Sequence, residues 1–379
     1  MKLRKSGYII CVLAIFSTCI YKFDPPSEGY ENLLVVEALL SDGDEAFEVR
    51  LSRSIPIDKY NFLPEEFAHV SLSDDAGNIV DLFEANPGRY LSYPDFRAYT
   101  GREYQLFIQT ADGKQYASES VLLRETPPID SVYYRYEERV VAGSENNVPG
   151  LQIYVTTHDM NNNTWYYRWE YSETWEFRTK YNSTLIWEDG MTKEREEQIN
   201  QCWKNNESSG VLVNTSKNLN EDIISELPLV FISNETDRLS IKYSILVKQY
   251  ALSERSYNFW KDLEKINENL GTLFDPQPYV LQGNIHNVSD ENDVVLGYFD
   301  ASAIQQERIF IARGEFPYFA TPGYPSCKDT IVSYGLIPAM IRQDFMLVGQ
   351  VPMGRYLLSE EPCIDCRLTG TNIQPDFWK

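Results

Sequence analysis

The sequence predicts a mainly β protein, with an N-terminal immunoglobulin-like β-sandwich followed by a larger β-rich domain that contains one long helix. Residues 30–125 hold short runs of alternating apolar and polar residues, separated by turn residues roughly every 8 to 12 positions. Residues 165–178 form a longer alternating run. From Ser253 to Leu270, apolar residues instead recur every three or four positions, which is typical of a helix.

The first residues predict export. Three of the first five residues are basic, an apolar run follows from Tyr8 to Phe16, and Ser17-Thr18-Cys19 comes next. This order is typical of a secretory signal, and the apolar run is about half of the ~20 residues that a transmembrane helix needs. Small residues before a Cys indicate a bacterial lipoprotein. We therefore expect residues 1–19 to be a lipoprotein signal peptide ending at Cys19, the lipid attachment site. Plain secretory cleavage nearby is the alternative.

Export places the later cysteines in an oxidising compartment. An even number of them remains after the signal: Cys202, Cys327, Cys363 and Cys366. This number favours structural disulfides. The spacing of Cys363 and Cys366 also fits a redox pair or half of a metal site. A zinc site prefers two such units, however, and a redox thiolate needs a helix N-terminus, which Gly370 and Pro375 disfavour.

The pairing of the four cysteines depends on the conformation of residues 363–366. If this segment is extended, the two side chains point to opposite faces, and each reaches Cys202 or Cys327. If it forms a tight turn, Cys363 and Cys366 can bond to each other. All three connectivities therefore remain open.

Composition limits the choice of partners. The chain has 379 residues and a formal net charge of −22, and loss of the three basic residues of the signal gives −22 − 3 = −25. A surface this acidic repels phosphate backbones. We therefore expect no nucleic-acid partner, whereas neutral or cationic ligands are compatible with the charge.

The elements of the first region are short strands joined by turns. Phe47, Val49 and Leu51 alternate with polar residues, and turn residues occupy 74–78. Asp112-Gly113 predicts a hairpin. Thr126-Pro127-Pro128 then interrupts the pattern. We therefore expect the immunoglobulin-like β-sandwich to cover residues 27–126.

The second domain is expected over residues 129–379. Six aromatic residues from Trp165 to Phe177 fall on odd positions, whereas the even positions are mostly polar. They predict either a platform for stacking sugars or, as we favour, a face packed into the core. A helix is expected near 253–270, a shorter one over Glu221–Leu227, a loop over 185–220, and a disulfide region at the C-terminus.

A set of ordered motifs resembles a known family. These motifs are Leu34-Val35-Val36-Glu37-Ala38, Gly271 to Pro278, Gly283-Asn284-Ile285, Leu296-Gly297-Tyr298-Phe299, Arg308-Ile309-Phe310, Cys363 to Arg367, Thr371-Asn372 and Pro375-Asp376-Phe377-Trp378. Together they resemble the DUF4249 family of Bacteroidota lipoproteins. The resemblance implies a lipid-anchored protein of the cell outer membrane, often encoded beside a TonB-dependent transporter. The family has no established catalytic residues, so the resemblance implies none here.

The sequence contains no recognisable catalytic motif. None of its three histidines, His69, His158 and His286, has a partner at metal-ligand spacing, and Asp290 to Asp293 lacks the longer loop of a calcium site. We expect no cofactor and no metal. The resemblance implies a non-enzymatic binding or accessory subunit of a TonB-dependent nutrient transporter. The alternative is an exported hydrolase that acts on polysaccharide or peptide through a pair of its 56 acidic residues.

Overall fold

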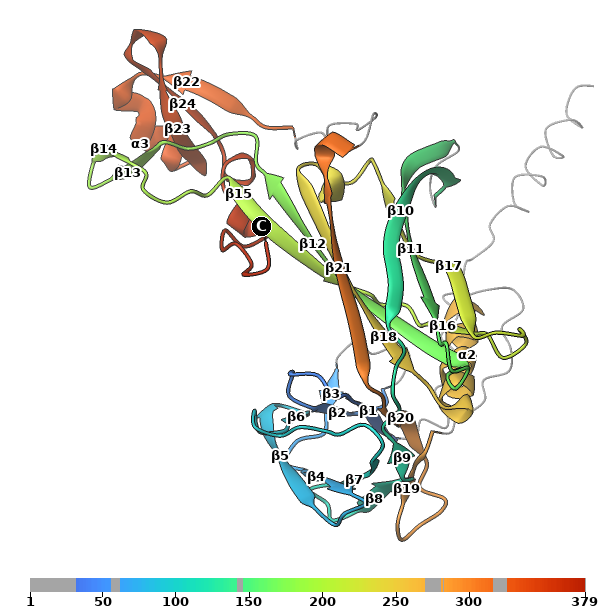
Figure 1. The fold of residues 1–379 in the computed structure, drawn as a ribbon. Helices are drawn as coiled ribbons and strands as arrows, with labels where there is room; N and C mark the ends of the chain where they lie inside the picture. Colours follow the sequence, from blue (N-terminus) through green and yellow to red (C-terminus); the bar gives the residue numbers. More distant parts are fainter. Residues whose placement is uncertain are drawn as a thin grey trace, which may run out of the picture.

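The computed structural model describes residues 32–55, 62–141, 146–269, 281, 283–315 and 326–378. The signal peptide expected at 1–19 and the lipid site expected at Cys19 lie outside these residues. In the described part the protein is mainly β, as the sequence predicts (Figure 1). No helix of this described part is both long and apolar enough to cross a bilayer.

The N-terminal strands form a nearly closed, barrel-like sheet, which we call the barrel unit. Its path runs β19 (Ile285–Asn287), β8 (Gln115–Ser118), β7 (Glu103–Gln109), β4 (His69–Asp74), β5 (Ile79–Asn86), β6 (Arg89–Leu91), β2 (Glu48–Arg53), β1 (Leu34–Leu40) and β20 (Val295–Ala301). Two short strands lie off this path, β3 (Leu63–Pro64) beside β2 and β9 (Val121–Leu122) beside β7. The alternation seen in the sequence places Val49 and Leu51 inside, while Arg50 between them is exposed.

Two strands of the barrel unit come from far along the chain. β20 pairs with β1 in parallel, from Leu34 opposite Val295 to Leu40 opposite Ala301, and β19 pairs with β8. The barrel unit therefore includes residues from beyond the linker, which the boundary expected between 126 and 129 leaves out. A Pro-Pro pair predicts a break in the local chain but not which distant strands pair. β1 and β20 lie about 260 residues apart, and no short sequence pattern predicts that they pair.

The second region is a sandwich of two sheets. One sheet contains β10 (Ile129–Val140), β11 (Asn147–His158) and β17 (Ile223–Ser233). The other contains β15 (Gln201–Glu207), β12 (Tyr166–Arg178), β18 (Lys242–Ala251) and β21 (Ile304–Ala312), with β16 (Leu212–Thr215) beside β12. The aromatic face of β12, including Tyr167, Trp169 and Phe177, is buried in the core between the sheets. The interpretation as a core face is confirmed, and this face is no sugar platform.

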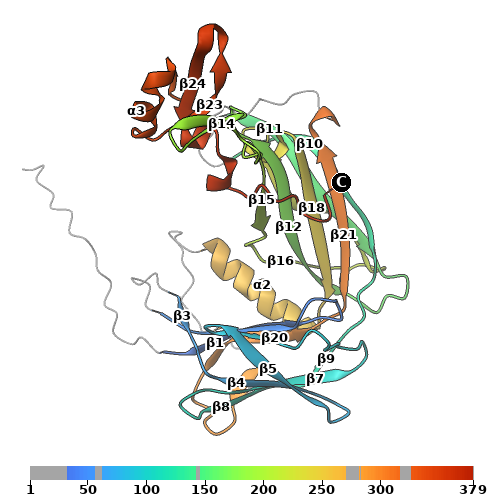
Figure 2. The same cartoon turned by 90° about the vertical axis from the view of Figure 1, so that its left-hand side faces the viewer.

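Helix α2 (Glu254–Asn269) confirms the helix expected near 253–270. The Ser253 hydroxyl accepts the Ser256 N–H at 3.1 Å and so caps the first turn. Figure 2 shows α2 above β1 and β20 and beside β16, at the junction of the two regions. The helix expected over Glu221–Leu227 is wrong, because that segment is part of β17, and the loop expected over 185–220 contains four short strands.

The C-terminal residues form a small third unit. It contains β22 (Asp329–Val332), β24 (Arg355–Glu360), β23 (Phe345–Val351), α3 (Ile337–Ile341) and the hairpin of β13 (Leu185–Glu188) and β14 (Met191–Glu194). The chain then returns to the second region, where Trp378 is buried against Trp203 and Phe310 (Figure 1).

Two disulfides fasten this third unit. Cys202 bonds to Cys366 and Cys327 bonds to Cys363, with Cα–Cα distances of 5.8 and 6.0 Å. Residues 361–363 and 366–368 are short 3₁₀ turns rather than extended chain. Even so, each of the two closely spaced cysteines reaches a distant partner, which is the pairing that an extended segment predicted.

Candidate functional site

A groove with a volume of about 760 Å³ lies between the barrel unit and the second region. We call it the junction groove. One wall comes from barrel residues around Gly101 and from 122–125, and the other from residues 158–166. The linker Thr126-Pro127-Pro128 and the start of α2 complete the lining.

Buried hydrogen bonds fix the linker that forms the groove floor. The Thr126 hydroxyl donates to the Ala303 carbonyl at 2.6 Å and lies 3.1 Å from the Ser302 hydroxyl. The Ala251 N–H donates to both hydroxyl oxygens, at 3.0 and 2.8 Å. The floor is therefore tied to β18 and to the residues that follow β20.

A second set of bonds centres on Gln249, which is completely buried. Its Nε2 donates to the Pro127 carbonyl at 2.8 Å and to the Thr157 hydroxyl at 2.9 Å, and its Oε1 accepts from Trp169 Nε1 at 2.9 Å. Together with the bonds of Thr126 and Ser302 to Ala251, this satisfied buried network holds the linker and the end of β20 against the sandwich. The junction groove is consequently preformed, as ligand sites usually are.

The groove wall at 158–164 carries charged groups. Nδ1 of His158 lies 2.7 Å from both carboxylate oxygens of Asp130, and this hydrogen bond raises the pKa of His158. The Asp159 carboxylate accepts the N–H groups of Asn161, Asn163 and Thr164, each at 2.9 Å. Burial raises the pKa of Asp159, but these bonds outweigh it, and the net pKa is below its usual range.

Behind this wall lies the buried carboxylate of Asp222. It accepts hydrogen bonds from Tyr167 Oη at 2.7 Å and from the Ser216 hydroxyl. Burial raises the pKa of Asp222. The Asp222 N–H donates to the Asn162 side chain at 2.7 Å, and its carbonyl accepts from the Asp159 N–H at 3.0 Å. Asp222 thus holds the loop that shapes the groove wall.

The remaining lining combines apolar groups with two acidic residues and one basic residue, Arg124. Trp165 and Leu252 contribute apolar surface, and the Met160 side chain at the rim is 85% exposed. Glu125 is exposed, and Glu254 is paired with a lysine outside the lining. A groove of this size with apolar surface and a few polar groups suits an oligosaccharide or a short peptide. Its carboxylates favour a neutral or cationic ligand over an anionic one.

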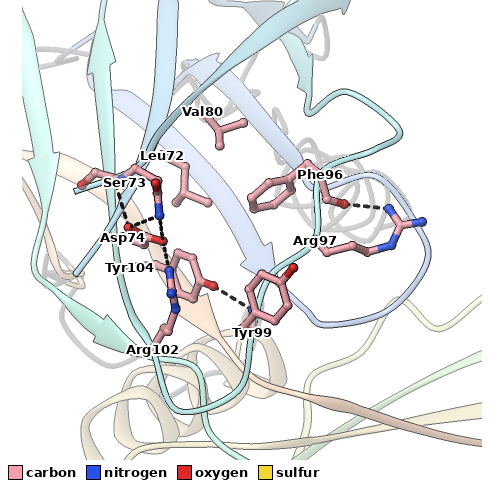
Figure 3. A pocket seen from close by; sticks show the side chains of 10 residues that line it. Leu72, Ser73, Asp74, Val80, Phe96, Arg97, Tyr99, Arg102 and Tyr104 are labelled. Atoms are coloured by element: carbon pink, nitrogen blue, oxygen red, sulfur yellow. Dashed lines mark hydrogen bonds and ion pairs between the residues drawn. The ribbon is translucent and has the colours of Figure 1, made fainter. Parts of the chain in front are cut away.

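A smaller hollow of about 160 Å³ lies within the barrel unit, where its lining includes Leu72, Val80 and Phe96 (Figure 3). Asp74 lies at its edge, where it accepts from Arg102 Nη1, the Asn78 side chain and two backbone N–H groups of its own turn. These bonds lower the pKa of Asp74. Tyr104 Oη accepts the Tyr99 N–H at 2.7 Å. The polar groups around this hollow serve the β4–β5 turn and its neighbours, so we favour the junction groove as the functional site.

The residues singled out by sequence lie mostly away from the groove. The four cysteines form disulfides away from the groove, with Cys202 in β15 and the others in the C-terminal part. His69 pairs with Asp81 on the barrel surface at 3.1 Å, and of the three histidines only His158 lines the groove. Asp293 accepts from a lysine, a tyrosine and an asparagine side chain. Within the described ranges, no group of three or more His, Cys, Asp or Glu side chains is placed to hold a metal.

Sequence reasoning missed the groove as a site. It is assembled from loops of both regions, and each loop alone resembles an ordinary polar connection. The local signal that was available is the sequence Thr157 to Tyr166, where a His-Asp pair and two aromatic residues flank a run of asparagines.

Two of the motifs that carry the family resemblance, those with Gly283 and Gly297, have structural roles where β1, β19 and β20 of the barrel unit meet. A Cβ on Gly283 would lie 1.6 Å from the Gly297 carbonyl, and one on Gly297 would lie 1.9 Å from the Val36 carbonyl. Glycine is therefore required where β1 and β20 meet the start of β19. These motifs specify the fold rather than a reaction.

Comparison with known proteins agrees with this resemblance. The chain matches no curated protein. Residues 20–308, which include the barrel unit and the whole junction groove, match the model described as domain of unknown function DUF4249. Since this match covers more than half of the sequence, the chain belongs to the DUF4249 family.

Proposed function

We propose that the protein is a lipid-tethered lipoprotein of the outer membrane that binds a nutrient in the junction groove, without turnover, as an accessory subunit of a TonB-dependent transporter. The observation that carries the binding role is the preformed groove of about 760 Å³. A fixed, mixed apolar and polar groove holds a ligand without paying the entropy of ordering loops.

Three further observations support the location and the partner. The order of residues 1–19 is that of a lipoprotein signal. Two disulfides are typical of proteins outside the cytoplasm. Membership of DUF4249 supports the transporter as partner by association with neighbouring genes, which is weaker support than a contact. A membrane tether raises the effective concentration of such a partner, so modest affinity is enough.

Ligand binding is tested with the purified chain against neutral oligosaccharides and cationic peptides, by thermal shift and then by calorimetry. Glu125→Lys reverses a charge on the groove rim and should weaken a cationic ligand by about tenfold, as expected for loss of one partly exposed charge contact. The matched control is Glu235→Lys, which makes the same change at an exposed position that does not line the groove. Equal loss in both variants contradicts the groove as the site.

The partner is tested in cells with a photo-crosslinking residue at position 160, on the groove rim, and at position 353 in the third unit as control. Both side chains are highly exposed, at 85% and 94%. Capture of a TonB-dependent transporter from position 160 supports the proposal. If no transporter is captured and the purified protein cleaves a glycan or peptide library, the exported hydrolase replaces it.

We also propose that the barrel unit is a closed variant of the immunoglobulin-like sandwich expected from the sequence. In support, β5 pairs with β4 through its first half and with β6 through its second half, so one strand passes between two facing halves of the sheet. An experimental structure with a continuous hydrogen-bonded ladder between β19 and β20 would instead define a true barrel.

A further inference from the structure

The barrel unit carries an exposed apolar segment on the connection between β2 and β4. Within six residues, Phe62, Leu63 and Phe67 leave 66%, 46% and 78% of their surface exposed. Single exposed apolar residues are ordinary, but three large ones in a short segment indicate an interaction surface. We call Phe62, Leu63 and Phe67 the apolar tip.

Hydrogen bonds hold the backbone of this segment in one conformation. The Tyr90 hydroxyl donates to the Glu65 carbonyl and accepts from the Ala68 N–H, both at 2.9 Å. The Glu84 carboxylate accepts the N–H groups of Phe67 and Gly88, both at 3.0 Å. The apolar tip is therefore presented by a fixed scaffold, and its side chains are not exposed merely through lack of order.

Phe67 adopts a backbone conformation that its side chain disfavours. Its φ is +60°, in the left-handed region that a bulky residue rarely occupies. A fold keeps such strain where it positions a side chain for use. Here the strain directs into solvent a phenylalanine that makes little contact with the protein, since most of its surface is exposed.

Two of the three carboxylates beside the tip, Glu65 and Glu84, are compensated, whereas Glu66 is exposed to solvent. Glu65 forms an ion pair with Arg53 at 2.6 Å, and both side chains are nearly buried, at 13% and 11% exposure. Both Glu84 oxygens accept backbone N–H groups. This compensation lowers the cost of bringing the tip close to an apolar medium.

The tip lies next to the point where the tethered chain enters the fold. Arg53 Nη1 donates to the Asn32 carbonyl at 3.5 Å, and the Ser54 N–H donates to the Leu33 carbonyl at 2.9 Å. Arg53 is also the β2 residue opposite Leu63. Since Asn32 follows Cys19 by 32 − 19 = 13 residues, a lipid on Cys19 lies within about 45 Å of Asn32 even if the tether is fully extended.

We propose that the apolar tip inserts into the surface of the lipid bilayer and docks the barrel unit on the membrane that holds the anchor. The inference rests on the proposed lipid tether, and it names the bilayer itself as the partner of this surface. Insertion buries two phenylalanines and a leucine, and it adds a second attachment to the acyl chains. The acidic charge of the protein favours a zwitterionic surface over an anionic one.

The test measures flotation of the chain from Ile20 onward, which carries neither the signal peptide nor a lipid, with vesicles of phosphatidylcholine. The tip variant carries Phe62→Ser, Leu63→Ser and Phe67→Ser. The matched control carries Ile79→Ser, Val140→Ser and Met353→Ser, which remove equally exposed apolar side chains elsewhere. We expect the tip variant to partition at least about tenfold more weakly than the parent chain, and the control to partition like the parent.

Each other outcome overturns the inference. Equal partitioning of the parent and the tip variant excludes the tip as the membrane contact. If the parent chain does not float, the bilayer is excluded as its partner. If the parent chain and the control self-associate but the tip variant does not, the tip binds a second copy of the chain instead. Unchanged melting temperatures confirm that the variants fold. Because acylation is absent throughout, a wrong tether assignment is detected separately, by the lipid mass on the wild-type N-terminal peptide.

Discussion

The side-chain amide of Asn284 makes both hydrogen bonds that a neighbouring strand would make to Phe299. Its Nδ2 donates to the Phe299 carbonyl at 2.8 Å and its Oδ1 accepts the Phe299 N–H at 2.9 Å. Asn284 is 3% exposed, so these polar groups are out of reach of water. The amide thereby pairs the Phe299 N–H and C=O on the free edge of β20. This edge is the seam of the barrel unit, where its sheet does not close onto β19.

Replacing this amide should destabilise the whole chain. Asn284→Leu keeps the size of the side chain but leaves the buried N–H and C=O of Phe299 unpaired, which costs about 2–4 kcal/mol. The measurement is the free energy of unfolding in urea. Asn161→Leu, at an exposed position, should stay within about 0.5 kcal/mol of wild type. A similar small change for Asn284→Leu would show that the seam opens to water.

The close approach at the same seam makes Gly297 irreplaceable. Gly297→Ala places a methyl group 1.9 Å from the Val36 carbonyl, at a φ of +102°. We expect a loss of about 3 kcal/mol or more, or no folded protein. Gly101→Ala is the control, because its φ is +84° but nothing lies within 4 Å of the new methyl group. It should cost only about 1 kcal/mol, so equal losses would contradict the role of the contact.

Local patterns predicted local structure well. Alternation located β2 and β12, and the three-to-four spacing located α2. The helix expected over Glu221–Leu227 failed because the pairing of β17 with β11, including Thr157 opposite Ile224, overrides local propensity. The arrival of β20 beside β1 and the assembly of the junction groove depend on contacts between distant segments, which a single sequence does not encode in any short pattern.

The disulfides should stabilise the chain through the size of their loops. Cys202–Cys366 has a sequence separation of 164 and Cys327–Cys363 one of 36, for which chain entropy gives about 5 and about 4 kcal/mol. Non-reducing peptide mapping should recover these two pairs. Cys366→Ala with Cys202→Ala should lower the melting temperature more than Cys363→Ala with Cys327→Ala. The reverse order, or four free thiols, would contradict this account.

One buried residue on the aromatic face of β12 is the acidic Glu173. Glu173 occupies an odd position there, is completely buried, and accepts from Tyr243 Oη at 2.7 Å and Arg238 Nη1 at 3.1 Å. Arg238→Met should cost about 3 kcal/mol, because it leaves a buried carboxylate without its counter-charge. Adding Glu173→Gln removes that charge and should recover about 1 kcal/mol or more in denaturant unfolding. Purely additive losses would mean that solvent already screens the pair.

The pair of His158 and Asp130 should make the charge of the junction groove depend on pH. The hydrogen bond to Asp130 raises the pKa of His158, so the folded chain binds this proton more tightly than the unfolded chain does. The resulting stability is fully present below the ordinary histidine pKa of about 6.5, and it is lost as the pH rises through the raised value. The side chains are partly exposed, so the gain in stability is small.

The direct measurement is therefore an NMR titration of the three histidine rings. Asp130→Asn removes the charge but keeps a hydrogen-bonding group, and it should return the pKa of His158 towards its ordinary value. Because protonated His158 adds a positive charge to the groove wall, a cationic ligand should bind more weakly below this pKa, and the transition should move to lower pH in Asp130→Asn. A binding profile that is flat with pH, or one that Asp130→Asn leaves in place, would show that His158 does not face the ligand.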